Sequence, residues 1–145
     1  MPTIYQAIQK MISGESPGAP VGRLIGFHVV AAKPGEATVE LDAGPQHTNP
    51  MGTLHGGVLC DIADAAMGIA YACALGEDES FTTLELKINF LRPVWKGTLR
   101  AMGRVVKNGT TIGLVECDVF DDQKRLIARA SSTCMTLRGK QAHGR

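Results

Sequence analysis

The order of apolar and polar positions divides the chain into a helical start, a helical middle and several extended runs. Near the N-terminus, Ile4, Ile8, Met11 and Ile12 recur at helical spacing, which predicts a short amphipathic helix. The Gly- and Pro-containing stretch SGESPGAP should end this helix. We interpret residues 1–20 as a helix and linker that pack as a cap on the domain that follows in the sequence.

Extended structure is predicted on both sides of a central apolar stretch. Residues 24–44 alternate apolar and polar side chains around a Pro-Gly turn, which predicts a hairpin of two short strands. Four longer alternating runs follow the apolar stretch, and turn sequences separate them, so we expect an antiparallel meander. These runs cover residues 82–94, 97–109, 110–122 and 125–138.

The central stretch predicts a long helix over residues 57–75, with Gly76 as its stop signal. Ala, Leu, Met and Ile dominate this stretch and leave no wide polar face, so the helix should be buried. About six strands can bury such a helix by curving around it. The sequence therefore predicts an α+β fold in which an antiparallel sheet wraps a long central helix.

Composition and charge narrow the class of protein. The chain has 145 residues, of which 44% are apolar and 20% charged, and its net charge is +1, as expected for one globular domain. It has no Lys/Arg block and few aromatic residues, which argues against nucleic-acid binding. Two aspartates inside the longest apolar stretch argue against a membrane span, and the N-terminus lacks a signal-peptide pattern. We expect a cytoplasmic protein with reduced thiols, because the cysteines form no CxxC pair: Cys60, Cys73, Cys117 and Cys134.

A pair of glycines stands where the loop of residues 43–56 meets the predicted helix. The first backbone N–H groups of a helix have no acceptor inside it, and the helix dipole favours negative charge there. Gly56 and Gly57 would therefore suit an oxyanion hole, because glycine lets an oxygen approach the backbone closely. The alternative is that the pair only makes a tight turn.

Two aspartates interrupt the apolar helix. Asp64 lies about two turns into it, where a carboxylate is costly unless it is paired or functional, so we interpret Asp64 as a general base or nucleophile. Asp61 is closer to the helix start, where we expect capping and dipole contacts to explain it. His55 precedes Asp64 by nine residues, about 13 Å along a helix and on the opposite side, so the two could cooperate only across a two-fold dimer. With His47 in the same loop and no second ligand at metal spacing, we expect no metal site.

The segment NPMGTLHGGVLCDIADAAMGIA, followed by TTLELKINFLRPVWKG and LIARASSTCMTL, resembles the hotdog-fold acyl-CoA thioesterases of the phenylacetate-degradation (PaaI-like) and 4-hydroxybenzoyl-CoA thioesterase type. The similarity covers about residues 20–137. It implies a hotdog domain at residues 21–138. From the sequence itself we expect residues 139–145, GKQAHGR, to form a frayed tail. The resemblance also implies hydrolysis of an acyl-CoA to the acid and CoA without a cofactor. A homodimer would be the minimal active unit, and a dimer of dimers the expected tetramer.

The resemblance also implies roles for individual residues. The Gly56 N–H would polarise the thioester carbonyl, while Asp64 of the partner chain would attack it or activate water. Thr83 would orient the water or the carboxylate, and Thr82 is the competing choice for this role. The residues that would position the reacting groups near the sulfur are Asn49 and His55.

The CoA and acyl subsites are less constrained by the sequence. We expect the acyl pocket near Met67, Tyr71, Phe81 and the N-terminal helix, while aromatic, medium-chain and general substrates all stay open. By analogy, the candidates that would bind the CoA moiety are Arg92, Lys96, Lys107, Gly109, Thr110 and Thr111. The alternative is that they are ordinary solvated residues at strand ends.

Two other functions remain as alternatives. One is a dehydratase or hydratase that acts on a β-hydroxyacyl thioester, and the HGG motif with its downstream aspartate argues against it. The other is a non-catalytic acyl-CoA-binding module, which would bind CoA esters without releasing a thiol.

Overall fold

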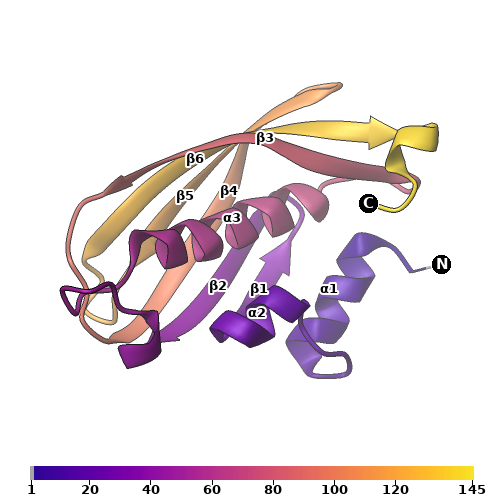
Figure 1. The fold of residues 1–145 in the computed structure, drawn as a ribbon. Coiled ribbons are helices and arrows are strands. Elements are labelled where there is room, and N and C mark those ends of the chain that lie inside the picture. Colours follow the sequence, from indigo (N-terminus) through magenta and orange to yellow (C-terminus); the bar gives the residue numbers. More distant parts are fainter. Residues whose placement is uncertain (1) are drawn as a thin grey trace.

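The fold is one antiparallel sheet that curves around a single long helix (Figure 1). The computed structural model describes residues 2–145. The predicted α+β architecture, with about six strands, a long central helix and a short N-terminal helix, is confirmed. Along the chain the elements are α1 (Ile4–Ser13), α2 (Pro20–Ile25), β1 (Phe27–Lys33), β2 (Glu36–Ala43), η1 (Pro45–His47), α3 (Gly56–Ala72), β3 (Glu79–Phe90), β4 (Gly97–Asn108), β5 (Ile112–Phe120), β6 (Leu126–Arg138) and η2 (Gly139–Ala142).

The strand order corrects the predicted meander. The hairpin of β1 and β2 forms as predicted, and β4, β5 and β6 pair in succession. β3, however, pairs only with β6 and lies at the sheet edge, so the order is β1-β2-β4-β5-β6-β3. The connection from β3 to β4 is tied to the loop before α3, because the Leu54 N–H donates to the Val94 carbonyl (2.7 Å). It therefore crosses the ends of β5 and β6 instead of closing a hairpin.

Small residues allow α3 to lie close to the sheet. Ala63, Ala66 and Ala70 are fully buried on the side of the helix that faces the strands. Opposite them on β4 stands Gly103, where an added Cβ would be only 2.5 Å from the carbonyl oxygen of Ala66. This contact between backbones tolerates no side chain, because protein interiors are packed almost without voids.

α3 is shorter at its C-terminus than predicted. It covers Gly56–Ala72 instead of residues 57–75. The chain tightens after Ala72, where the Leu75 N–H donates to a carbonyl three residues back (3.2 Å). Gly76 therefore lies outside the helix, and its N–H donates to the Glu79 carboxylate (2.8 Å).

The N-terminal segment contains one more helix than predicted. α1 forms as expected, with a capping box between Thr3 and Gln6. The predicted strand start at residue 24 is wrong, because α2 occupies this position. The ring of Pro20 fixes φ near the helical value, which suits the first position of α2. Gly26, with φ +101°, ends the helix before β1 begins.

The C-terminal tail is partly ordered. Residues 139–145 were expected to fray, but Gly139 turns the chain after β6 with φ +59°, and the short helix η2 follows. All four cysteines are free. Within residues 2–145, no helix is long and apolar enough to cross a membrane.

We predict that Gly103→Ala destabilises the fold, because its Cβ would collide with the α3 backbone. Overpacking of this kind costs about 1–3 kcal/mol, and each kcal/mol lowers the melting temperature by roughly 2–4 °C in a domain of this size. Thermal unfolding at one fixed protein concentration measures the effect. Gly18→Ala is the matched control, since its Cβ meets nothing within 4 Å. Equal melting temperatures for the two variants would contradict the close contact.

Candidate active site

A buried histidine anchors the loop that precedes α3. The Nδ1 of His47 accepts the N–H of Gly44 (3.1 Å), so its Nε2 carries the ring proton and donates to the Ile25 carbonyl (2.6 Å). The carbonyl of His47 in turn accepts the N–H of His55 (2.9 Å). His47 therefore joins α2, the loop and the start of α3.

Asn49 shapes the same loop from within. Its side-chain oxygen accepts the Met51 N–H (2.9 Å), and its side-chain NH₂ donates to the Thr53 hydroxyl (2.8 Å). Its backbone N–H also donates to the Thr53 carbonyl (2.8 Å). These bonds close a tight turn and fix the path of the chain toward His55.

The two glycines at the N-terminus of α3 differ in whether their backbone N–H groups have an acceptor. His55 is the N-cap residue, and its Nδ1 accepts the Gly57 N–H (2.9 Å). Within residues 2–145, nothing accepts the N–H of Gly56. Gly56 therefore presents a free donor at the positive end of the helix dipole. Sequence analysis missed the capping role of His55, because histidine is not among the preferred N-cap residues.

Each of the two glycines is in close contact with an aromatic ring. A Cβ on Gly57 would be 2.8 Å from Nδ1 of His55, so a side chain there would disturb the cap. A Cβ on Gly56 would be 2.8 Å from the ring of Phe90, whose side chain is half exposed at the end of β3. The Phe90 ring thus borders the free N–H group.

Asp64 lies on the side of α3 that the sheet does not cover. The sequence predicted a buried carboxylate, but the side chain is exposed in the single chain, which is a correction. Within residues 2–145 it has no ion-pair or hydrogen-bond partner. Surrounding protein atoms nevertheless remove part of its hydration and raise its pKa, and the negative charge of Asp61 raises the pKa further. Asp64 is thus an unpaired carboxylate whose pKa is raised by its surroundings.

Asp61 has a different position from the one predicted. It was expected to cap the helix start, but the cap is His55 and the first turn of α3 contains no acidic residue. Asp61 instead lines the same cavity as Asp64, one turn earlier on the helix. It therefore raises the pKa of Asp64 by its negative charge. The three-residue spacing of the two aspartates indicates this shared helix face, which the assignment of Asp61 to the helix start did not take into account.

The structure distinguishes the two candidate threonines. Thr83 pairs with the buried Cys134 of β6 and lines the cavity together with Asp64. Its hydroxyl lies 3.9 Å from the Cys134 sulfur. Neighbouring residues on a strand point to opposite faces, so Thr82 points to the outer face of the sheet. Of the two threonines, Thr83 alone lines the cavity that contains Asp64.

One chain does not bring the two reactive groups together. Gly56 and Asp64 are eight residues apart on α3, which is about 12 Å along a helix. Asp64 and Thr83 line one cavity, whereas Gly56 and His55 lie outside it. This geometry agrees with the predicted separation of His55 from Asp64.

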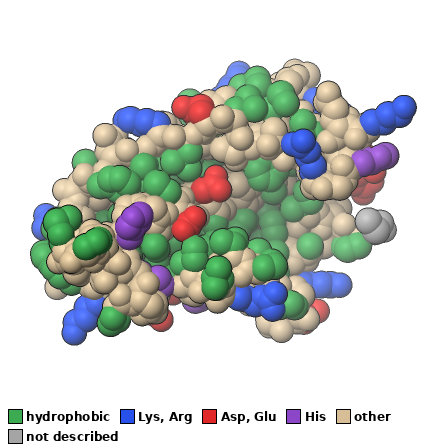
Figure 2. Space-filling view, in the orientation of Figure 1, with side chains coloured by type: hydrophobic (Ala, Val, Ile, Leu, Met, Phe, Trp, Pro, Cys, Tyr) green, Lys and Arg blue, Asp and Glu red, His purple; other side chains and the backbone are tan. Residues whose placement is uncertain are grey.

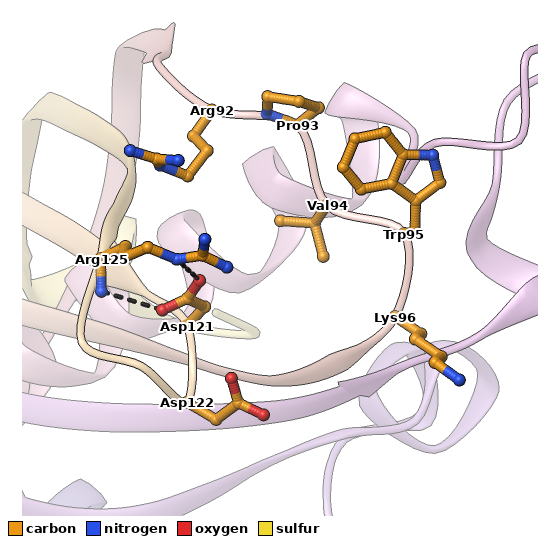
Figure 3. A pocket seen from close by; sticks show the side chains of 8 residues that line it. All are labelled: Arg92, Pro93, Val94, Trp95, Lys96, Asp121, Asp122 and Arg125. Atoms are coloured by element: carbon orange, nitrogen blue, oxygen red, sulfur yellow. Dashed lines mark hydrogen bonds and ion pairs between the residues drawn. The ribbon is translucent and has the colours of Figure 1, made fainter.

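The candidate CoA-binding residues form two groups at opposite ends of β4. Eleven residues of strand between Lys96 and Lys107 correspond to about 36 Å, so a single chain cannot offer both groups to one phosphate. Arg92 and Lys96 border a surface cavity of about 420 Å³ near the start of α3, which also contains Trp95 (Figure 3). The other group is the β4–β5 turn, which closes by a bond from the Gly109 N–H to the Ile112 carbonyl (2.9 Å) and comprises Lys107, Gly109, Thr110 and Thr111.

The main cavity lies between the N-terminal helices and α3. It has a volume of about 640 Å³, and Asp61, Asp64 and Thr83 line one part of it. Figure 2 shows apolar side chains in this hollow and acidic side chains beside it. Phe81 and α1 line the cavity as predicted. Met67 and Tyr71 do not: both are buried in the core between α3 and the sheet, where the Tyr71 hydroxyl bonds to Thr136 (2.7 Å).

Comparison with known proteins identifies the family of the chain. The family model described as "Thioesterase superfamily" matches residues 51–128, more than half of the chain. A protein of Saccharolobus solfataricus, named as an inferred esterase, is 33% identical over 81% of this chain and 84% of its own length. Human acyl-coenzyme A thioesterase 13 is 25% identical over 92% of this chain and 96% of its own length. The solved structure of Escherichia coli PaaI, from the phenylacetic acid degradation operon, has a TM-score of 0.81 at 21% identity and covers 94% of this chain and 98% of that one.

The fold and the family match together identify a hotdog-fold thioester hydrolase. The chain belongs to the thioesterase superfamily, which confirms the resemblance found in the sequence. Within residues 2–145, no group of three or more His, Cys, Asp or Glu side chains could hold a metal ion.

We predict that Asp64 titrates above the ordinary aspartate pKa of about 3.9, and that Asp61→Asn lowers its pKa. Removal of a neighbouring negative charge makes the ionised form of Asp64 easier to reach. A carboxyl ¹³C NMR titration measures both values. Asp122→Asn, at the exposed β5–β6 turn, should leave the Asp64 titration unchanged. An unchanged or raised Asp64 pKa in Asp61→Asn would disprove the coupling.

Proposed function

We propose that this protein hydrolyses acyl-CoA thioesters at a site shared by two copies of the chain. In this arrangement Gly56 belongs to one protomer and Asp64 to its partner. The observation that carries the proposal is the pair of unsatisfied groups on α3, a free N–H at its start and an unpaired carboxylate about 12 Å further along. A two-fold axis can place the one beside the other.

Gly56 supplies the electrophilic half of the site. When water or a carboxylate attacks the thioester carbonyl, its oxygen gains negative charge. The free Gly56 N–H and the positive end of α3 stabilise this charge, and they are oriented before the reaction begins. His55 and Asn49 support this half by holding the start of the helix and the loop in front of it.

Asp64 supplies the nucleophilic half, by one of two routes. As a general base, it takes a proton from water, and the water oxygen attacks the carbonyl carbon. The C–S bond then breaks, and Asp64 passes the proton to the departing CoA thiolate. As a nucleophile, its carboxylate expels the CoA thiolate and forms an anhydride that water then hydrolyses. Its raised pKa makes it a stronger base than an ordinary aspartate, and Thr83 in the same cavity is placed to orient the water or the carboxylate.

The exposed edge of the sheet supports a dimer. β3 is an edge strand of 12 residues with β6 as its neighbour, whereas α1 packs against the opposite edge strand β1. Leu84 and Phe90 on β3 are 52% and 55% exposed. A long apolar edge of this kind favours pairing with a second copy. Exposed apolar residues on the outer face, including Met102 and Leu114, offer a further surface for a tetramer.

The dimer also accounts for the two groups of CoA-binding candidates. Arg92 and Lys96 lie near the Gly56 end of β4, and Lys107 with the Gly109–Thr111 turn lies at the other end. Across a two-fold axis, the first group of one protomer can serve the same CoA as the second group of its partner. No cofactor is needed for this hydrolysis.

A dehydratase or hydratase is a weaker alternative. Such an enzyme would use His55 as a base, but Nδ1 of His55 is occupied by the Gly57 N–H. A binding module without activity would not require an unpaired carboxylate with a raised pKa. Thiol release measured beside crotonyl-CoA hydration separates the three functions.

We predict that Asp64→Asn lowers kcat for thiol release at least a hundredfold, because the amide can neither attack nor accept a proton. Since the native pKa of Asp64 is raised, its ionised form opposes folding at neutral pH. The variant should therefore melt no lower than the wild type at pH 7. Release of free CoA from a panel of acyl-CoAs measures the loss. A variant that retains full activity would exclude Asp64 from the mechanism.

We predict that two inactive variants restore activity when mixed. Gly56→Val blocks one half of the site and Asp64→Asn the other, so a mixed dimer contains one intact site. Random mixing should restore about a quarter of wild-type activity. The two variants are unfolded, mixed and refolded together so that mixed dimers form. Each variant refolded alone is the control. A mixture as inactive as its components would show that each chain forms its own site.

A further inference from the structure

The cavity beside Asp64 has a polar end and an apolar end. Asp61, Asp64 and Thr83 form the polar end. From there the cavity follows α3 past Gly68 and Ile69 to Ala72, where the buried Ile8 of α1 packs against the helix. Apart from His28 on β1, the residues that line the remainder are apolar side chains and glycines.

The length of this cavity sets the size of its occupant. Asp64 and Ala72 are eight residues apart, about 12 Å along the helix. An extended peptide advances about 3.3–3.6 Å over three backbone bonds, and an alkyl chain advances similarly, so 12 Å accommodates roughly ten carbons. The volume of about 640 Å³ is that of an ordinary ligand pocket.

We propose that this cavity binds the acyl chain of a medium-chain aliphatic thioester, with α1 and α2 forming its outer wall. The proposal rests on the proposed function, because the carbonyl carbon must lie beside Asp64 for the chain to enter here. A charged or strongly polar acyl group would find no partner along the apolar walls. A straight aliphatic chain of about 8–12 carbons fills the cavity from the carboxylate to Ile8.

Gly68 controls passage through the middle of the cavity. It lies one turn beyond Asp64, and a Cβ at this position would be 3.3 Å from the ring of Phe81. The Phe81 ring itself packs edge-on against the buried Tyr71, with ring centroids 5.6 Å apart. A larger side chain at residue 68 would therefore close the cavity after the first few carbons.

A series of straight acyl-CoAs from two to sixteen carbons tests the proposal. In the wild type, kcat/KM should rise about fourfold for each added methylene, as expected for its burial, and level off near ten carbons. Gly68→Leu should lower kcat/KM for decanoyl-CoA at least a hundredfold while changing it less than threefold for butyryl-CoA. Ala7→Leu, on the exposed side of α1, is the matched control and should leave the series unchanged.

A second variant covers the case in which Gly68→Leu fails to fold. Ile12→Trp fills the cavity from α1 and should shorten the preferred chain in the same way. The proposal is overturned if benzoyl-CoA or phenylacetyl-CoA is hydrolysed faster than decanoyl-CoA, or if a folded variant lowers kcat/KM equally for all lengths. Absence of thiol release with every acyl-CoA would instead overturn the proposed function.

Discussion

The contact between Gly103 and the backbone of α3 decides which face of the helix is available for chemistry. Because the strand and the helix meet without side chains between them, one face of α3 is committed to the sheet. Its opposite face then carries Asp61, Asp64 and Gly68 toward the N-terminal helices. Each turn of the helix therefore has a core residue on one side and a cavity residue on the other. The positions of the candidate site and of the proposed acyl cavity both depend on this orientation.

The loop before α3 adds precision at the helix start. His47 and Asn49 use their polar atoms within the loop, and His55 uses its ring to satisfy one backbone N–H. The remaining N–H, on Gly56, is left without an acceptor by the same arrangement. The Gly56 N–H is thus free because the loop supplies an acceptor for the neighbouring Gly57 N–H and none for Gly56.

Periodicity in the sequence predicted the local structure well. The alternation of residues in β4, β5 and β6, and the unbroken apolar run of α3, each have a counterpart in the structure. The place of β3 at the sheet edge could not be predicted, because alternation does not encode which strand lies beside which. α2 was missed because its six residues are too few to show helical periodicity.

The candidate site could be predicted only in part, because spacing along the chain shows local relations but not contacts between distant segments. The motif around the glycines indicated Gly56 and Asp64, and the helical repeat indicated that they lie apart. The positions of Asp61 and His55 became clear only in the structure. From its place early in the helix, Asp61 was expected to cap the helix start, but His55 is the N-cap residue and Asp61 lines the cavity. Met67 and Tyr71 were placed in the pocket because apolar residues of a buried helix look alike until the position of the sheet is known.

The proposed reacting groups and the proposed wall of the acyl cavity lie on separate parts of the chain. α3 and the loop before it carry the former, whereas α1 and α2 form a cover over the cavity. The Ile25 carbonyl of α2 is hydrogen-bonded to His47 of that loop, so α1 is the part of the cover that lies apart from the loop. Substitutions on the cavity side of α1 can therefore change which acyl chains fit while the loop before α3 stays in place. Such a division lets evolution vary selectivity and preserve chemistry within one small domain.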